Sequence, residues 1–366
     1  MRKKYIICLV PVLLFLTFSA YPQDISTTSE NRTVFKLMPY YQNWSGNDNT
    51  NIKQFSSRFL LDYYFDRNTR LSLQSGYASS EALNNTLNGL SDMQLSLNYK
   101  LRKVNIALDA GINLPTGKER LDINKFPSSI VLSQDVFGMK IPLLGQGTNI
   151  FAGVTWANEI SDDVAIGLGA SYQIKGKYQP LSGDNTTYNP SNELLLTGGA
   201  DFRINSTTTL SGDIIGILYG KDKVNNNVAF SAGTRTIFNV IFKQYYGYNN
   251  LVIFLRYRNS AADELTSLQN LVSSEKINPN SFMTFINFRH YISGLLSLVY
   301  SVEGRFYQKT IAPFSGYNIY GLGITSNISL SSNLLLPITL KYYTGSSKGA
   351  PSVNGFDVGL GLSIIF

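Results

Sequence analysis

The sequence closes with Gly-Phe-Asp-Val-Gly-Leu-Gly-Leu-Ser-Ile-Ile-Phe, residues 355–366, and the pattern of this stretch indicates the fold class. Every second residue from Phe356 to Phe366 is large and apolar, whereas the residues between them are small or polar in four of five cases. Because a β-strand sends alternate side chains to opposite faces, the stretch predicts a strand with one apolar and one hydrophilic face. A strand of this kind would aggregate if it lay at an open sheet edge in water. The pattern therefore favours a closed barrel in which the apolar face meets lipid.

The same alternation recurs along the whole chain. Between residues 91 and 101, for example, the odd positions from Met93 to Leu101 are apolar or aromatic, and the even positions from Asp92 to Lys100 are polar. Stretches of this type predict about sixteen strands, each long enough to cross a bilayer when tilted. The candidate strands are 33–44, 54–66, 70–78, 91–101, 104–114, 149–157, 164–177, 192–203, 208–219, 228–243, 251–259, 281–291, 295–307, 317–330, 334–344 and 355–366.

The connections between these strands alternate between short turns and longer loops. Short turns are predicted at 66–69, 102–103, 158–163, 204–207, 244–249, 292–294 and 331–333. This asymmetry is typical of outer-membrane barrels, which have short periplasmic turns, longer external loops and an even strand number. The sequence therefore predicts an all-β protein, a transmembrane antiparallel up-and-down β-barrel of about sixteen strands, with about fourteen or eighteen also compatible with the pattern.

Three of the longer loops have distinct compositions. Residues 79–88 read as a polar loop. Pro115–Thr148 is the longest connection and carries enough apolar side chains to fold against another surface, either inside the lumen or as an external cap. Residues 260–280 predict a short helix, because Ser260-x-x-Asp263 resembles a capping box and leucines follow at a spacing of three.

The amino terminus has the pattern of a signal peptide. The cations Arg2, Lys3 and Lys4 precede an apolar core from Tyr5 to Phe18, and small or turn-forming residues follow. The core is shorter than the roughly 20 residues that a spanning helix needs. We expect residues 1–23 to be the signal peptide, 24–32 a short periplasmic lead, and 33–366 the barrel.

Composition narrows the function classes. The single cysteine, Cys8, lies within the predicted signal, so we expect a mature chain without disulfide or thiol chemistry. Charged residues make up 15%, below the roughly 25% of soluble domains. Removing the three cations of the signal from the formal charge of +7 leaves +4, which argues against a nucleic-acid partner.

Three local patterns lie in order between residues 90 and 200. Leu90-Ser-Asp92 opens a strand that ends in Asn98-Tyr-Lys100; Leu114-Pro-Thr-Gly-Lys118 closes the next; Gly145-Gln-Gly-Thr148 leads to Gly176-Lys-Tyr178 and Tyr188-Asn-Pro190. This third of the chain resembles the outer-membrane family of the meta-pathway of phenol degradation, and distantly the fatty-acid outer-membrane transporters. The resemblance implies a barrel that passes small, often hydrophobic molecules. The amino-terminal plug of the fatty-acid transporters has no counterpart here, because only about ten residues precede the first strand.

Catalytic chemistry finds little support in the sequence. The only histidine, His290, shares its parity with Phe282, Ile286 and Phe288, which places it on the lipid side of its strand. A hydrolase would need that histidine inward beside a serine, and a transition-metal site would need further histidines or cysteines. We therefore expect no enzyme activity, no metal and no cofactor.

Charged residues of the inward parity are the candidates for the lining of a lumen. Arginines outnumber acids on the later strands, which favours a weak preference for anions, although pairing across neighbouring strands could equally make a polar filling. The lumen-lining candidates are Arg58, Asp62, Lys100, Asp109, Arg203, Asp213, Arg235, Arg256, Arg258, Arg289, Glu303 and Arg305.

The long loop and the aromatic residues supply the remaining candidates. Lys118, Glu119, Arg120 and Asp122 are candidate constriction charges if the loop enters the lumen. The terminal Phe366 fits the aromatic that outer-membrane barrels present to the barrel assembly machinery. Aromatics near strand ends predict the interface girdles of such barrels. This group comprises Trp44, Trp156, Tyr63, Tyr99, Tyr245, Tyr246 and Tyr342.

The sequence thus predicts an outer-membrane, porin-like channel or transporter for small-molecule solutes in a Gram-negative cell envelope. Its mechanism would be passive diffusion through a polar lumen, its surroundings outer-membrane lipid. The alternative is a barrel of the same fold that does not conduct and serves in structure, adhesion or assembly.

Overall fold

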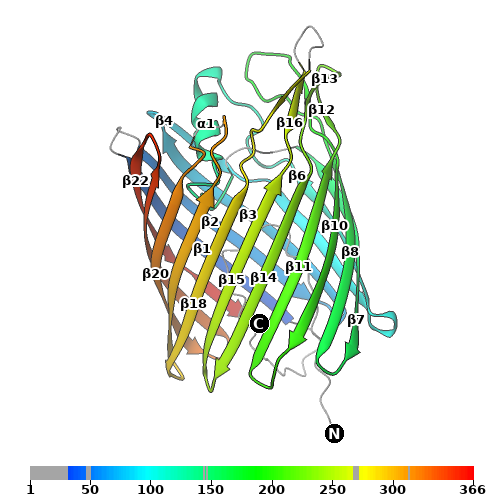
Figure 1. The fold of residues 1–366 in the computed structure, drawn as a ribbon, viewed down its shortest axis with the longest axis vertical. Coiled ribbons are helices and arrows are strands. Elements are labelled where there is room, and N and C mark those ends of the chain that lie inside the picture. Colours follow the sequence, from blue (N-terminus) through cyan, green and yellow to red (C-terminus); the bar gives the residue numbers. More distant parts are fainter. Residues whose placement is uncertain (1–31, 47–50, 143–144, 146, 267–271, 312–313) are drawn as a thin grey trace.

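The computed structural model describes residues 32–46, 51–142, 145, 147–266, 272–311 and 314–366. The predicted signal peptide and almost all of the short lead lie outside the described residues. Within the described part, strands tilted across the wall form a closed antiparallel barrel (Figure 1), and their number is sixteen. The predicted fold class and strand count are therefore confirmed.

Each barrel strand pairs with its neighbours along the chain, and two strands are interrupted. In order they are β1 (Arg32–Gly46), β2 (Asn51–Tyr64), β3 (Thr69–Ala82), β4 (Asn85–Leu90) with β5 (Met93–Leu101), β6 (Ile106–Leu114), β7 (Asn149–Ser161), β8 (Val164–Lys175), β10 (Glu193–Arg203), β11 (Thr208–Tyr219), β14 (Arg235–Tyr246), β15 (Asn249–Ser260), β18 (Ser281–Ser293), β19 (Leu296–Tyr307), β20 (Asn318–Ser331), β21 (Leu334–Ser347), and β22 (Ala350–Leu360) with β23 (Leu362–Ile365).

Closure of the barrel joins the two ends of the described chain. β1 pairs with β2 on one side and with β22 and β23 on the other, in a single register from Val34 opposite Ile365 to Gly46 opposite Val353. Thr33 and Phe366 exchange backbone hydrogen bonds of 3.2 and 2.9 Å beyond the last ladder pair. No strand of the barrel is thus left with an unpaired edge.

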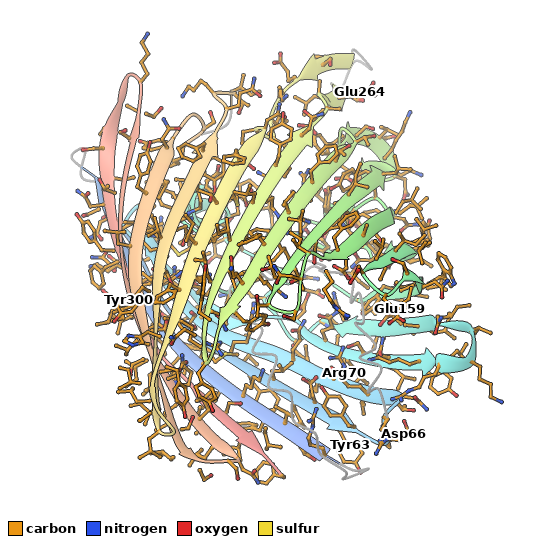
Figure 2. The ribbon with its side chains drawn as sticks, turned by 60° about the horizontal axis from the view of Figure 1, so that its bottom comes forward. Tyr63, Asp66, Arg70, Glu159, Glu264 and Tyr300 are labelled. Atoms are coloured by element: carbon orange, nitrogen blue, oxygen red, sulfur yellow. The ribbon has the colours of Figure 1, made fainter. Side chains whose placement is uncertain are left out.

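The two ends of the barrel differ. The end that carries the short turns, here called the turn end, includes η1 (Arg102–Val104) and the turn at Asp66. The opposite loop end carries α1 (Phe126–Leu132), η2 (Ile123–Lys125) and a five-stranded external sheet (Figure 1). Figure 2 shows Asp66 at the turn end, Glu264 at the loop end and Tyr300 on the outside of the wall. The external sheet has the order β17 (Val272–Glu275), β16 (Asp263–Thr266), β13 (Asn227–Ser231), β12 (Lys221–Val224) and β9 (Tyr188–Asn189).

Two predicted loop structures are wrong. The polar loop at 79–88 is a hairpin, because β3 and β4 continue to a tip at Leu83 and Asn84, both with positive φ. Polar side chains suit strands that extend beyond the lipid, so composition alone was misleading there. The helix expected within 260–280 is wrong for residues 263–266, which form β16 and pair with β17, whereas Leu268 and Leu271 lie outside the described residues. None of the described helices is long and apolar enough to cross a membrane.

The closing strand has the alternation that the sequence predicts. Phe356, Val358 and Leu360 are exposed on the outer face, while Asp357 points inward and is buried. The interruption at Gly361 faces Pro337 of β21, where an added Cβ would lie 2.5 Å from the proline ring. Glycine is required at this point because the ring occupies the inner face that a side chain would need.

Gly355 offers a test of the inner packing. A Cβ at this position would lie 2.6 Å from the indole of Trp44, which lies flat over the glycine. We expect Gly355→Val to lower the free energy of unfolding by about 1–3 kcal/mol, since overpacking displaces the indole. Gly216→Val is the matched control, because no atom lies within 4 Å of its added Cβ. Urea unfolding in lipid, followed by tryptophan fluorescence, measures both; equal losses in the two variants would contradict the packing described here.

Candidate functional site

The inner face of the barrel is occupied at the loop end by the connection between β6 and β7. Outward side chains such as Leu168 and Leu322 are 60% and 65% exposed, whereas Gln42 and Gln54 on the inner face are 1% and 0% exposed. These two glutamines hydrogen bond to residues 138–141. Residues 133–142, here called the lumen segment, therefore lie inside the barrel.

The neck of this loop is built from the sequence patterns that carry the family resemblance. Asp92, in the break between β4 and β5, accepts a 2.9 Å hydrogen bond from the backbone N–H of Gly117. The N–H of Gly145 donates to the carbonyl of Lys118 at 2.9 Å, which joins the two ends of the loop. An added Cβ on Gly117 or Gly145 would lie 2.7 Å from the Asp92 carboxylate. Three distant motifs thus meet to fix the points where the loop leaves and re-enters the wall.

Apolar packing holds the loop against one side of the barrel. Val136, Phe137 and Ile141 are 1–3% exposed and belong to the same hydrophobic cluster as Trp44 and Tyr343. The Phe137 ring meets the Trp44 indole edge-on at 5.7 Å, and the indole stacks on Tyr343 at 5.2 Å. Trp44 therefore does not belong to an interface girdle, as the sequence pattern suggested, because it occupies an inward position of β1 and is 1% exposed.

The two inward glutamines bind the backbone of the lumen segment. The amide of Gln42 donates to the Gly138 carbonyl at 3.3 Å, and its oxygen accepts from the Lys140 N–H at 3.0 Å. The Gln54 oxygen accepts from the N–H groups of Lys140 and Ile141 at 3.0 and 3.2 Å, and its amide donates to the Ile141 carbonyl at 3.1 Å. Because buried backbone groups are costly when unpaired, these contacts specify where the segment lies.

Charged groups add a second set of tethers. Lys140 Nζ lies 3.4 Å from the carboxylate of Asp357, which also accepts hydrogen bonds from Gln42 at 3.0 Å and from the Tyr343 hydroxyl at 3.2 Å. Burial lowers the pKa of the Lys140 ammonium, and the Asp357 charge opposes that effect. Arg58 Nη2 donates to the Lys140 carbonyl at 3.3 Å.

Arg305 connects the segment to a buried charge cluster on β19 and β21. Its Nε lies 2.9 Å from Glu303, whose carboxylate is also 3.4 Å from Lys341. Its Nη1 donates to the Val136 carbonyl at 3.0 Å, and its guanidinium lies over the rings of Trp44 and Tyr343. A buried arginine with these partners holds both the wall and the segment in one arrangement.

The lumen segment also reaches across to β15. Asp135 pairs with Arg258 at 2.6 Å, and its carbonyl accepts a hydrogen bond from the Tyr307 hydroxyl at 3.0 Å. All of the tethers described so far involve β1, β2, β15, β19 and β22. The segment thus narrows the lumen from one side.

The predicted lumen charges take several different partners. Asp62 accepts a hydrogen bond from Ser72, and Asp109 accepts one from Asn98 at 2.6 Å. Asp213 accepts from Asn239 at 2.6 Å, which in turn accepts from Arg256 at 2.8 Å. Arg58, Arg258, Glu303 and Arg305 meet the lumen segment or its charge cluster, as given above. The strand register places the remaining candidates on inward positions, namely Lys100, Arg203, Arg235 and Arg289.

The predicted constriction charges lie near the neck of the loop. Lys118 and Arg120 are exposed, and Asp122 pairs with Lys125 at 3.8 Å. Leu121, which follows Glu119 and Arg120 in the chain, forms a β-bridge with Leu181 of the next loop. Their role in a constriction stays a prediction. Asp135 and Lys140 are the charged residues of this loop that enter the lumen. They are not among the predicted candidates, although they flank apolar residues of the same loop.

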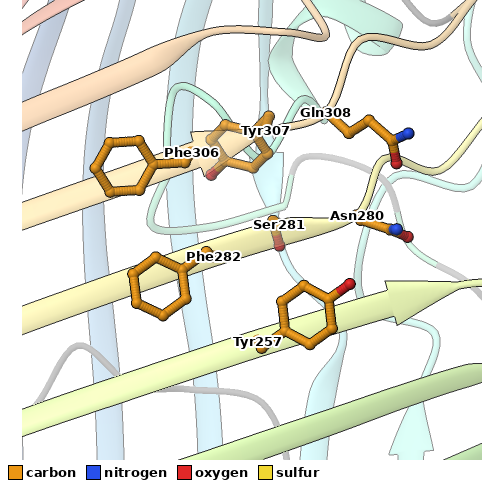
Figure 3. Close-up of a pocket in the computed structure, with 7 residues that line it drawn as sticks. All are labelled: Tyr257, Asn280, Ser281, Phe282, Phe306, Tyr307 and Gln308. Atoms are coloured by element: carbon orange, nitrogen blue, oxygen red, sulfur yellow. The ribbon is translucent and has the colours of Figure 1, made fainter.

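The outer wall carries an aromatic row near the loop end. Tyr257, Phe282 and Phe306 occupy paired outward positions on β15, β18 and β19 (Figure 3). Phe282 stacks on Phe306 at 6.0 Å, and a shallow pocket opens beside them towards Asn280 and Gln308. His290 is exposed on the same outer face at the turn end. Among the described residues, no cluster of His, Cys, Asp or Glu has the arrangement of a metal site.

Comparison with known proteins relates this chain to others through its fold and not through its sequence. No family model matches the sequence, and no curated protein matches it. The CdiB protein of Acinetobacter baumannii has a TM-score of 0.51 and 10% identity over 89% of this chain and 60% of its own. OpdQ of Pseudomonas aeruginosa gives a TM-score of 0.48 and 11% identity over 92% of this chain and 100% of its own. An outer membrane channel of Pseudomonas putida F1 gives 0.41 and 10% over 94% and 99%.

Gln54→Leu tests the tethering of the lumen segment. The variant leaves the N–H group of Ile141 without its acceptor in a buried site, whereas the N–H group of Lys140 keeps the Gln42 oxygen. We expect the exchange of the Ile141 amide with deuterium to accelerate by about tenfold or more, as a lost buried hydrogen bond predicts. Gln94→Leu is the control, because Gln94 is an inward glutamine that pairs with Gln74 instead. Hydrogen–deuterium exchange of residues 136–142 gives the readout, and unchanged protection in Gln54→Leu would refute the tethering.

Proposed function

We propose that the protein is an outer-membrane channel through which small solutes diffuse passively, with the lumen segment as its constriction. The observation that carries this proposal is the arrangement of the loop between β6 and β7. Its tethers lie on β1, β2, β15, β19 and β22, and the described contacts include none from the segment to β8, β10 or β11. A passage along β8, β10 and β11, on the side of the lumen that the segment does not contact, would form a narrowed pore.

The charge of the inner wall supports a preference for anions. Cations at inward positions outnumber carboxylates, and six of them lie on the five barrel strands from β10 to β18. Arg203, Lys243 and Arg289 occupy inward positions towards the turn end, and Arg235, Arg256 and Arg258 towards the loop end. Charges on a low-dielectric wall raise the local concentration of solutes of opposite sign.

The finer family relationship is also a proposal. The neck of the loop brings together Asp92, Gly117 and Gly145, which come from the three patterns that resemble the meta-pathway family of phenol degradation. A shared role in building the neck of the loop would explain why these short motifs follow the same order in this chain as in that family. Phe366, 71% exposed at the end of the closing strand, is available for recognition by the barrel assembly machinery, and the apolar outer face is suited to outer-membrane lipid.

One observation favours a second candidate, a barrel that does not conduct and serves in structure, adhesion or assembly. The lumen segment is bound through several buried hydrogen bonds and ion pairs, which is the packing expected of a permanent closure. Conductance separates the two candidates.

Shortening the lumen segment tests the constriction. Replacement of residues 134–141 by a short Gly-Ser linker removes the side chains that fill the lumen and leaves the neck intact. We expect a several-fold rise in single-channel conductance in planar bilayers, because conductance follows the narrowest cross-section. A linker of the same composition in place of residues 222–229 of the external sheet is the control, and it should leave the conductance close to that of the unaltered protein. Silent bilayers with both the unaltered and the shortened protein would favour the second candidate.

Reversal potentials under a potassium chloride gradient test the selectivity. We expect the unaltered channel to reverse towards the chloride equilibrium potential. A triple variant with Arg235→Gln, Lys243→Gln and Arg289→Gln should shift the reversal potential towards zero or towards the potassium value. Lys53→Gln is the control, because Lys53 lies on the outer face of β2 beside Glu81. Cation selectivity of the unaltered protein would contradict the proposed preference.

A further inference from the structure

The inner wall opposite the lumen segment is unexpectedly apolar. Ile215 and Ile217 on β11 are inward and buried, and they pack with Ile237 of β14. Further towards the turn end, Ile241 of β14 faces Phe254 of β15, and Phe254 faces Phe285 of β18 at 5.9 Å. We call these six residues the apolar track.

The track is separate from the packing of the loop. The upper residues Ile215, Ile217 and Ile237 form a cluster that shares no member with the cluster around Trp44 and Phe137. A wall that faces only water gains nothing from large apolar side chains, and lumens of outer-membrane barrels are usually polar. An apolar strip beside a passage is instead suited to contact with the apolar part of a solute.

Guanidinium groups lie beside the track at Ile217, Ile237 and Phe254. Cross-strand pairing sets Ile217 against Arg235 and Ile237 against Arg258. Arg256 lies over the Phe254 ring at 5.3 Å from its centroid, and Arg235 lies over the Tyr219 ring at 5.4 Å. Among the described residues, no carboxylate lies within ion-pair distance of Arg235. This guanidinium is thus available to a solute anion.

We propose that the passage favours small organic anions with an apolar body, such as aromatic or branched aliphatic monocarboxylates. This inference rests on the proposed channel function and names its solute class. The apolar body lies along the track, and the carboxylate moves between neighbouring guanidinium groups, which bind carboxylates through paired N–H donors. Inorganic anions use only the guanidinium groups, and neutral apolar solutes use only the track.

Block of the chloride current in planar bilayers, with the full-length protein without its signal, tests this inference. We expect benzoate to halve the current at a concentration about tenfold lower than acetate does, since its ring adds apolar contact. Benzyl alcohol, which has the ring without the charge, should block far less than benzoate.

Paired variants locate the effect. The double variant Ile215→Thr with Ile237→Thr should reduce the benzoate-to-acetate ratio by about threefold or more, because it removes apolar contact from the track. Ile214→Thr with Val240→Thr alters the lipid-facing neighbours, which are 44% and 40% exposed, and should leave the ratio unchanged. Arg235→Gln keeps the track and should weaken the block by benzoate, which provides a second test if the double variant does not fold.

The outcomes are distinct. Equal block by benzoate and acetate, with a normal chloride current, overturns the inference and leaves the channel function standing. Benzyl alcohol as potent as benzoate overturns the assignment to anions. Absence of any chloride current from the unaltered protein contradicts the proposed function, and the inference falls with it.

Discussion

Backbone pairing between the first and last strands closes the barrel, and every other feature of the molecule requires that closure. In hydrocarbon, an unpaired N–H or C=O has no water to bind, so a sheet that crosses the bilayer must close. β1 meets β22 and β23 in one register, despite Pro337 and the interruption at Gly361. Closure in turn divides every strand into an outer face that must be apolar and an inner face that is free to vary. All features that bear on function lie on that inner face or at the loop end.

The inner face is used asymmetrically. One side, from β19 through β22 to β2, holds most of the lumen segment through Gln42, Gln54, Arg305 and the pair of Lys140 with Asp357, and one further ion pair reaches β15. The other side, from β11 to β18, carries the apolar track and the arginines beside it. Buried charges that are fully paired fix a single arrangement of the segment, since loss of one partner would leave another charge uncompensated. In the proposed channel, a fixed constriction beside a patterned wall would be the physical basis for selectivity.

The parts of the structure that lipid enforces could be predicted from the sequence, and the parts that it does not enforce could not. Alternation at positions such as Phe356 to Leu360 follows from the two solvents on either side of the wall, so strand number and parity were predictable. The hairpin at 79–88 and the strands within 260–280 lie beyond the lipid, where alternation is not required. Trp44 was misplaced because nearness to a strand end does not decide which face a side chain occupies. The apolar track could have been recognised, because 237–242 and 251–255 have apolar residues at both parities; contacts made by the lumen segment, which join residues about 90 positions apart, could not.

A density map of the protein in lipid nanodiscs would show where the lumen segment lies. We expect density for residues 133–142 within the barrel, with the Lys140 side chain beside Asp357 and the backbone of 138–141 against Gln42 and Gln54. Density that places this segment outside the loop-end rim, over an unobstructed lumen, would contradict this arrangement.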